Sequence, residues 1–379
     1  MNRHALMGSV GALALSLSTP EPLSAQQVPE VVPGGALDLT LTGFNRFWVT
    51  GGQLDDEQQD DSLSRGPDFT MDTEFHVVAR GKSEEYGFEY GGTIEFEADT
   101  NQTLNTDETW LFLRGDFGEF RFGDDDSVID DNKIGGFTVA AGTGGIDGDV
   151  VSDILTYPVQ PYVSDDATKV TYYTPDFGGF LVAIGYTPNQ AEVDGAAFNG
   201  NALARKNGPE SVKVSDQVES ALVYQGDVAD IGVQASVYGA WARYNHNNDD
   251  DTYGDDSAFY SYGGGFALDL YGINVGAGGY HQKIGDFEQT AVNAGIGVGF
   301  GPVNTSLTWG QTVALSDSPG IGNPWLVVLS ADIGLAPGLS LAGDISYFDN
   351  EVDQTGAEIL GYSGGDKGWV GIARLGLDF

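Results

Sequence analysis

Residues 69–97 read FTMDTEFHVVARGKSEEYGFEYGGTIEFE, and this stretch decides the fold because apolar and polar side chains alternate along it. In its first half, one face carries Phe69, Met71, Phe75, Val77 and Ala79, and the opposite face carries Asp72, Glu74, His76 and Arg80. In its second half, Tyr86, Phe88, Tyr90, Ile94 and Phe96 oppose Glu89, Glu95 and Glu97. A period of two is typical of a β-strand with one apolar and one polar face. The stretch therefore predicts two strands whose faces meet different surroundings.

The same alternation recurs along most of the chain, and helical periodicity is nearly absent. We expect sixteen strands, at residues 36–51, 69–81, 86–99, 107–115, 119–124, 167–175, 179–188, 215–226, 230–245, 257–270, 273–284, 288–300, 303–315, 323–335, 338–350 and 368–379. Most of these segments suit a tilted strand that crosses a membrane, which needs about 9–11 residues. A soluble β-sandwich also shows alternation, so the strands alone leave both architectures open.

The connections between the expected strands separate these two architectures. Every second connection is mostly tight, as at 81–85, 116–118, 175–178, 301–302 and 336–337. The others are often long and acidic, as at 52–66, 125–166, 189–214, 246–256 and 351–367. A membrane barrel has short periplasmic turns and longer extracellular loops, whereas a sandwich has no reason to keep its long loops at one end. The alternation of connections therefore favours a barrel.

Backbone hydrogen bonding then fixes how the strands associate. In hydrocarbon every N–H and C=O group must find a partner within the protein, so a spanning sheet has to close on itself. Sixteen strands enclose an aqueous channel rather than a packed core. The predicted fold is all-β, a sixteen-stranded antiparallel transmembrane β-barrel with a polar, water-filled lumen.

Composition excludes several other classes of protein. The chain has no cysteine, so neither a disulfide framework nor a thiol nucleophile is available. Its formal net charge is -40, whereas a nucleic-acid-binding protein needs a basic surface. Such acidity can indicate disorder, but aromatic residues make up 11% of the chain and follow the alternating pattern. We therefore expect a folded protein that does not bind nucleic acid.

The first 25 residues have the pattern of a secretory signal peptide. A basic start at Arg3 precedes the small apolar stretch 5–18, and Leu23-Ser24-Ala25 offers a cleavage site. An uncleaved anchor is the alternative, but the apolar stretch is shorter than the roughly 20 residues that span a bilayer. We expect a signal peptide at 1–25, a short N-terminal extension at 26–35 and the barrel at 36–379.

Three stretches resemble the general-diffusion porins of Gram-negative bacteria, especially the alphaproteobacterial type. The stretch 41–46, LTGFNR, resembles the first strand of that family, with its inward arginine. The stretch 111–124, LFLRGDFGEFRFGD, resembles the hairpin that leads to the third loop of the family. The chain ends in LGLDF at 375–379, similar to the terminal signal read by the barrel-insertion machinery.

The resemblance implies a homotrimer in the bacterial outer membrane, in contact with membrane lipid and lipopolysaccharide. It also implies that the third loop, at about 125–166, folds inward and narrows the lumen to an eyelet. The acidic stretch of that loop would contain Asp147, Asp149 and Asp153. Where family members often carry an arginine after the hairpin, this chain has Asp124-Asp125-Asp126.

Charged residues on the polar faces of the strands are candidates for the pore lining. Alternation places basic Arg46, Arg80, Arg114, Arg121 and Lys169 on the lumen face. It places acidic Asp72, Glu74, Glu89, Glu95 and Glu97 on the same face of two adjacent strands. Basic groups that face the acids of the third loop would set up a transverse field and orient polar solutes. The alternative is that some of these charged residues lie near a barrel end and are simply solvated.

Two further patterns have weaker chemical meaning. Asp249 and Asp251 lie in an acidic run that could hold surface Ca²⁺, but Tyr260 stands where a calcium loop needs its glutamate, and simple solvation is the equal alternative. Residues 361–365, GYSGG, fit G-x-S-x-G, but a loop precedes them and a strand follows, whereas a nucleophile elbow lies between a strand and a helix. We expect no cofactor and no enzymatic activity.

The function predicted from these features is passive diffusion of small hydrophilic solutes and ions, with a moderate preference for cations. Confined lumen carboxylates concentrate cations and hinder anions. A porin specific for a sugar or an anion is the first alternative, and an outer-membrane hydrolase is the second. Liposome swelling that does not saturate with solute concentration would favour general diffusion.

Overall fold

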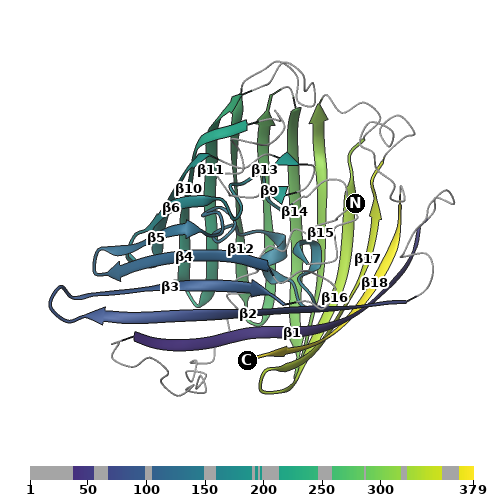
Figure 1. Cartoon of the computed structure of the whole chain (residues 1–379). Helices are drawn as coiled ribbons and strands as arrows, with labels where there is room; N and C mark the ends of the chain where they lie inside the picture. The colour runs from purple at the N-terminus through teal and green to yellow at the C-terminus, as the bar shows by residue number, and fades with distance from the viewer. Residues whose placement is uncertain are drawn as a thin grey trace.

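The protein folds into one closed antiparallel barrel, shown by the computed structural model in Figure 1. The structure describes residues 37–54, 67–98, 105–148, 159–189, 193–194, 197–198, 213–245, 258–285, 287–316, 322–351 and 367–379. Sixteen strands from these residues form the barrel, in the order β1-β18-β17-β16-β15-β14-β13-β12-β11-β10-β7-β6-β5-β4-β3-β2. The predicted fold class and the predicted number of barrel strands are confirmed.

The barrel strands lie close to their predicted positions. They are β1 (Leu37–Leu54), β2 (Asp68–Ser83), β3 (Phe88–Glu97), β4 (Asn105–Gly115), β5 (Gly118–Asp124), β6 (Thr168–Tyr173), β7 (Phe180–Asn189), β10 (Lys213–Val228), β11 (Ile231–Asn245), β12 (Phe259–Leu270), β13 (Ile273–Ile284), β14 (Phe287–Phe300), β15 (Val303–Ser316), β16 (Trp325–Ala336), β17 (Leu339–Asp349) and β18 (Lys367–Asp378). Between β7 and β10, the short strands β8 (Val193–Asp194) and β9 (Ala197–Phe198) pair separately. No helix in the described ranges is long and apolar enough to cross a membrane.

Short turns join the strands at one end of the barrel. The turn between β10 and β11 consists of Ala229 and Asp230, whose φ angles are 51° and 66°. Positive φ at both central residues is the geometry that matches the right-handed twist of a two-residue hairpin. At the other end the connections are generally longer, with one exception between Ile284 and Phe287. The predicted alternation of short and long connections therefore holds for the described barrel, except at this one connection.

The two faces of the wall differ in chemistry. The outward face carries exposed apolar side chains on every part of the circumference, including Leu111, Ile184, Val237, Leu329 and Ile345. The inward face carries buried polar side chains, including Glu74, Glu95, Ser236, Asn293 and Thr308. An apolar outer band suits hydrocarbon, and a polar inner face suits water. The alternation in the sequence is therefore the alternation between lipid and lumen.

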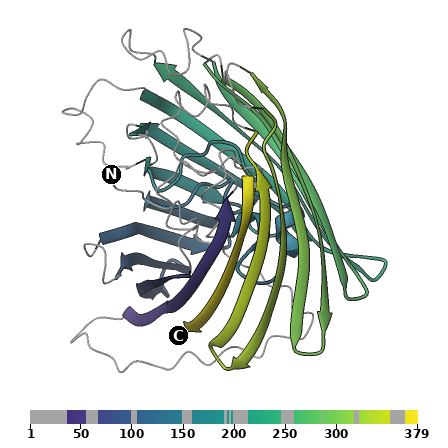
Figure 2. The same ribbon diagram turned by 90° about the vertical axis from the view of Figure 1, so that its right-hand side faces the viewer.

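The end of the chain closes the barrel. In Figure 2 the purple β1 lies beside the yellow β18, and the two strands pair from Phe44 opposite Asp378 to Leu54 opposite Gly368. One further residue extends this seam: Gly43 and Phe379 exchange two backbone hydrogen bonds of 2.9 and 3.0 Å. The side chain of Phe379 remains exposed on the outside of the wall. The last residue thus both completes the seam and presents an aromatic ring.

Deleting Phe379 should lower the yield of barrel in the outer membrane at high expression. The deletion removes two hydrogen bonds of the closing seam, each worth about 1 kcal/mol, together with the terminal ring. Refolding in detergent should remain possible because the rest of the β1–β18 ladder stays. Phe379→Tyr keeps the backbone and the ring and serves as control. The measurement is the amount of heat-modifiable barrel in isolated outer membranes, and equal yields for the deletion and Phe379→Tyr would contradict a role for the terminus.

Candidate functional site: the charged inner wall and the β5–β6 connection

The connection between β5 and β6 reaches the strand that lies opposite β5. Seven strands (β6, β7, β10–β14) separate β5 from β15 on one side, and seven (β16–β18, β1–β4) on the other. The connection contains two 3-10 helices, η2 (Gly136–Val139) and η3 (Gly145–Asp147). Figure 1 shows this segment in front of β12–β15, and η2 packs on those four strands. Residues far apart in sequence thus meet across the barrel.

Polar side chains of the inner wall hold this connection through its backbone. The Gly136 N–H donates to Asn293 Oδ1 (2.7 Å), the Ala141 N–H to Ser306 Oγ (2.8 Å) and the Ile146 N–H to Thr308 Oγ1 (3.1 Å). Further along, the Thr143 hydroxyl donates to Asp344 Oδ2 (2.6 Å). All four acceptor side chains are buried. A segment with only two short 3-10 helices therefore finds further backbone partners on the wall.

Glycines let the connection approach the wall closely. A Cβ built on Gly276 of β13 would lie 2.4 Å from the carbonyl oxygen of Gly135, and one on Gly295 of β14 would lie 2.1 Å from that of Gly136. No real side chain can occupy such distances without moving the backbone. The glycines of β13 and β14 therefore form a bed for residues 135–136, which explains part of the unusual glycine content.

Two apolar clusters hold the stretch 125–148 of the same connection. Val128 and Ile129 are fully buried among residues of β6, β7 and β10–β14. Ile146 is fully buried against Leu326, Val328 and Phe348 of β16 and β17. Burying such a side chain stabilises by about 1.5–3 kcal/mol. The stretch 125–148 is thus anchored by apolar packing near each of its ends and by hydrogen bonds between them.

The predicted basic residues do not form one cluster. Arg114 and Arg121 share Glu119, which accepts from Arg114 Nε and, at 2.8 Å, from Arg121 Nε. Arg121 also approaches Asp125 (3.3 Å) and Asp131 (3.4 Å) of the connection. Arg114 is half-exposed beside the short turn to β5. This group is therefore an ion-pair network at the base of the connection.

The other predicted basic residues lie elsewhere. Lys169 is buried and donates to the carbonyl oxygens of Asp125 and Asp165. Arg46 lies 3.7 Å from Asp72, with its guanidinium over the ring of Phe44. Arg80 is exposed, eight positions along β2 from Asp72, which is roughly 26 Å at about 3.3 Å per residue. Alternation fixes the face of a strand residue but not its height, so the predicted wall of arginines is spread along the barrel.

Of the acids predicted for the third loop, the structure places one, and it pairs with a lysine. The described one, Asp147, lies 3.2 Å from Lys133, which also binds Asp130 (2.5 Å) and Gln160 (2.6 Å). Burial opposes the charge of this ammonium, but Asp130 and Asp147 outweigh it and raise the pKa of Lys133. Asp149 and Asp153 lie outside the described residues. Asp147 therefore pairs within its own connection.

Two basic residues of the lumen were missed by the sequence analysis. Lys133 lies in a connection without periodicity, so nothing in the pattern could place it. Arg374 on β18 approaches the Gly142 carbonyl (3.5 Å) and the ring of Trp48. Its position alternates with the outward Leu375 and Leu377, so the same argument that selected Arg46 could have found it.

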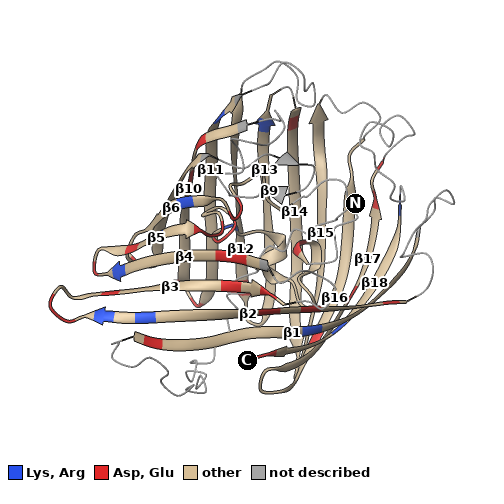
Figure 3. Cartoon of the chain, in the orientation of Figure 1, with Lys and Arg blue, Asp and Glu red and all other residues tan. Residues whose placement is uncertain are grey.

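An acidic band occupies the inner wall of β2, β3 and β4. Figure 3 shows red segments lying side by side on β3 and β4. Predicted Asp72, Glu74, Glu95 and Glu97 are all buried on the inward face, whereas predicted Glu89 is exposed near the short turns. The structure adds Asp107 and Glu108 of β4, beside a register shift opposite β3. The band therefore extends over three strands rather than two.

The β5–β6 connection continues this band. Burial is the first cause that raises the pKa of Asp125 and Asp165, each to about 6, and the pKa of Asp166 to about 8. Neighbouring carboxylates add to the effect on all three. Asp126 and Asp166 lie close enough to Glu108 for the three to share a metal ion. Acids of the wall and of the connection thus meet at one side of the lumen.

Two sequence candidates cannot be placed. Asp249 and Asp251, the possible calcium ligands, lie outside the described residues, as does the G-x-S-x-G stretch at 361–365. In the described ranges, three groups of His, Asp or Glu have ligand atoms within 4.8 Å of one another, and all three include residues of β2, β3 or β4. All three groups therefore involve the acidic band.

Solved structures with this architecture come from several bacteria. OmpF of Salmonella typhi in complex with daunomycin has a TM-score of 0.62 and 13% identity, covering 91% of this chain and 98% of that one. An anion-selective porin from Comamonas acidovorans has a TM-score of 0.60 and 15% identity, covering 90% and 100%. A variant of the Rh. blastica porin has a TM-score of 0.56 and 14% identity, covering 90% and 100%. At these identities the likeness establishes the fold.

Sequence comparison establishes the family. No curated protein sequence shows significant similarity to the chain. The family model described as Gram-negative porin matches residues 11–354, which is most of the 379-residue chain. Together with the closed sixteen-stranded barrel and its polar inner face, this match shows that the chain belongs to the Gram-negative porin family.

Proposed function

We propose that this barrel is an outer-membrane diffusion channel for small hydrophilic solutes and ions, with a moderate preference for cations. The family and the barrel point to the outer membrane of a Gram-negative bacterium and to a channel. The observation that carries the proposal is the contrast between an apolar outer face and a charged inner face crossed by the β5–β6 connection. In this proposal the connection is the constriction, and solutes pass between it and the acidic band.

The preference for cations follows from how charges are paired in the lumen. Arg121 and Lys133 each contact at least two carboxylates, and Arg46 lies beside Asp72. Glu108, in contrast, has the carboxylates of Glu95, Asp125, Asp126 and Asp166 as charged neighbours. Glu95 has those of Glu74 and Asp107, together with His76. Fixed negative charge in a narrow aqueous path concentrates cations. Since the similar Comamonas porin is described as anion-selective, this fold accommodates either sign, and the lining of each chain decides.

Assembly and export are further parts of the proposal. A structural neighbour, OmpT of Vibrio cholerae, is described in a trimer form, and we propose that this chain also forms a homotrimer, in contact with membrane lipid and lipopolysaccharide. Export would use the signal peptide at 1–25, which lies outside the described residues. The proposed function has no catalytic step and no cofactor.

Removing charge from the acidic band should weaken cation preference. Replacing Glu74 and Glu97 with Gln removes two buried inner-wall carboxylates, and the cation-to-anion permeability ratio should fall by about twofold or more. The control replaces Glu84 and Glu85, exposed in the β2–β3 turn, and removes the same charge outside the lumen. The measurement is the reversal potential across a tenfold KCl gradient. An anion-selective wild type, or equal shifts in both variants, would refute the assignment of selectivity to the band.

Adding a methyl group to one of the glycines under residues 135–136 should lower the conductance of the pore. Gly295→Ala places a Cβ against the Gly136 carbonyl, so the connection must move away from β14 toward the lumen, and single-channel conductance should fall. Gly299→Ala on the same strand is the control, because its Cβ meets only Asn304 Oδ1 at 3.5 Å. If Gly295→Ala conducts like the control, the connection does not limit the current.

A further inference from the structure

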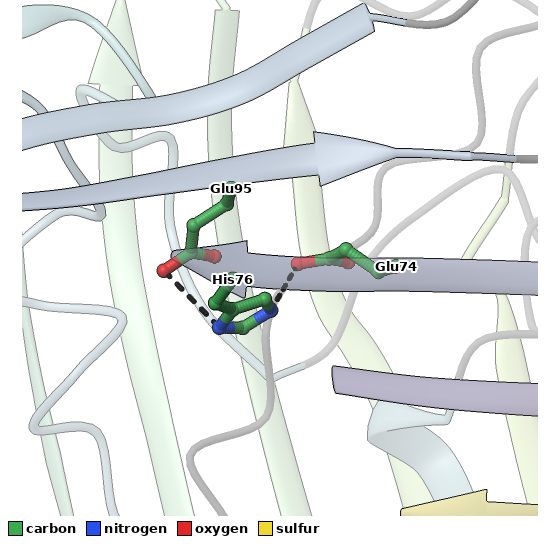
Figure 4. A group of neighbouring side chains, drawn as sticks. All are labelled: Glu74, His76 and Glu95. Atoms are coloured by element: carbon green, nitrogen blue, oxygen red, sulfur yellow. Dashed lines mark hydrogen bonds and ion pairs between the residues drawn. The ribbon is translucent and has the colours of Figure 1, made fainter. Parts of the chain in front are cut away.

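One histidine of the inner wall lies between two glutamates. Figure 4 shows His76 of β2 with Nε2 directed at Glu74 and Nδ1 directed at Glu95, at 2.7 and 3.5 Å from their Oε1 atoms. His76 stands directly opposite Glu95 on β3, and Glu74 is two positions away on the same face of β2. Both glutamates are buried, whereas the imidazole is partly open. The wall thus presents one nitrogen and two oxygen ligands from two paired strands.

The charges around this histidine are unbalanced. Glu95 also makes a side-chain hydrogen bond to Glu74, so two carboxylates contact each other as well as the ring. Asp107 of β4 adds a third negative neighbour to both glutamates, and Glu97 lies within ligand distance of Glu74 and Asp107. One imidazole and two carboxylates therefore converge from two paired strands, which is a geometry that can hold a cation.

The donor set selects the kind of cation. Imidazole suits zinc and other late first-row metals, whereas Ca²⁺ and Mg²⁺ take oxygen ligands. One ligand atom each from Glu74, His76 and Glu95 already lie within 4.8 Å of one another, so rotamer changes of these side chains can gather them round one ion. Three protein ligands and an open position toward water are the composition of an exchangeable zinc site. Both strands are held by the barrel ladder, so the ligands need no refolding to meet.

We propose that Glu74, His76 and Glu95 form a binding site for a divalent cation of the Zn²⁺ class on the lumen wall. The inference rests on the proposed channel function, because the metal reaches the site from the lumen. A bound ion neutralises part of the acidic band and occupies space beside the constriction. Zn²⁺ should therefore lower the K⁺ current through the channel in a saturable manner, which Mg²⁺ at the same concentration should not do.

The test compares two histidine variants of the intact barrel in planar bilayers. His76→Gln removes the nitrogen ligand, while His281→Gln is the control. His281 lies on β13 with its ring beside Tyr260 and Tyr262, both exposed on the outer face, and its Nδ1 is 2.9 Å from Thr290 Oγ1. KCl conductance is recorded first without metal, then during titration with Zn²⁺ and, separately, Mg²⁺. Calorimetric titration of the detergent-refolded protein with Zn²⁺ measures binding without reference to current.

We expect saturable Zn²⁺ binding and inhibition in the wild type and in His281→Gln, and at least about tenfold weaker binding in His76→Gln. Glu95→Gln should also weaken binding, and it carries the test if His76→Gln does not fold. Equal Zn²⁺ affinity in the wild type and in a folded His76→Gln or Glu95→Gln variant would overturn the site. A barrel that binds Zn²⁺ but conducts no KCl would instead overturn the proposed channel and leave the metal site standing.

Discussion

A peptide N–H or C=O group in hydrocarbon has no water to bond, and the whole structure depends on this constraint. The constraint forces the wall to close, so β1 must pair with β18. This pairing extends to Phe379, whose backbone is hydrogen-bonded to that of Gly43. Closure by tilted strands with alternating side chains then separates an outer face for lipid from an inner face for water. The charged lumen is thus a consequence of backbone pairing.

Within that wall the irregular β5–β6 connection faces the same demand for hydrogen-bond partners. It meets the demand with wall side chains, such as Asn293 and Thr308, and with glycines that bring its backbone against β13 and β14. Its lysine, Lys133, pairs with Asp130 and Asp147 of the same segment. The connection's other carboxylates, among them Asp126 and Asp166, meet Glu108 of β4 and extend the acidic face of β2–β4. The acidic band and the anchored connection are therefore two parts of one arrangement.

Prediction from sequence succeeded where local rules determine the outcome. Period-two alternation placed all sixteen barrel strands, because lipid and water impose opposite chemistry on adjacent residues. It also assigned Glu74 and Glu95 to the inward face, but it gave no height, so Arg80 and Arg114 were grouped with residues far along the wall. Lys133 and the contact of Gly136 with Asn293 could not be foreseen, since no pattern within a connection reports a partner 157 positions away. The role of Gly295 could not be predicted either, because it depends on the contact with residue 136, which only the folded structure reveals.

In the proposed function the barrel is an open path through which solutes diffuse without a saturable binding step. Swelling of liposomes that contain the refolded protein, measured with uncharged sugars of increasing size and concentration, tests this property. For an open path we expect the swelling rate to rise in proportion to the solute concentration and to fall smoothly as the solute becomes larger. Absence of swelling, or a rate that saturates for one sugar and not for others of similar size, would contradict it.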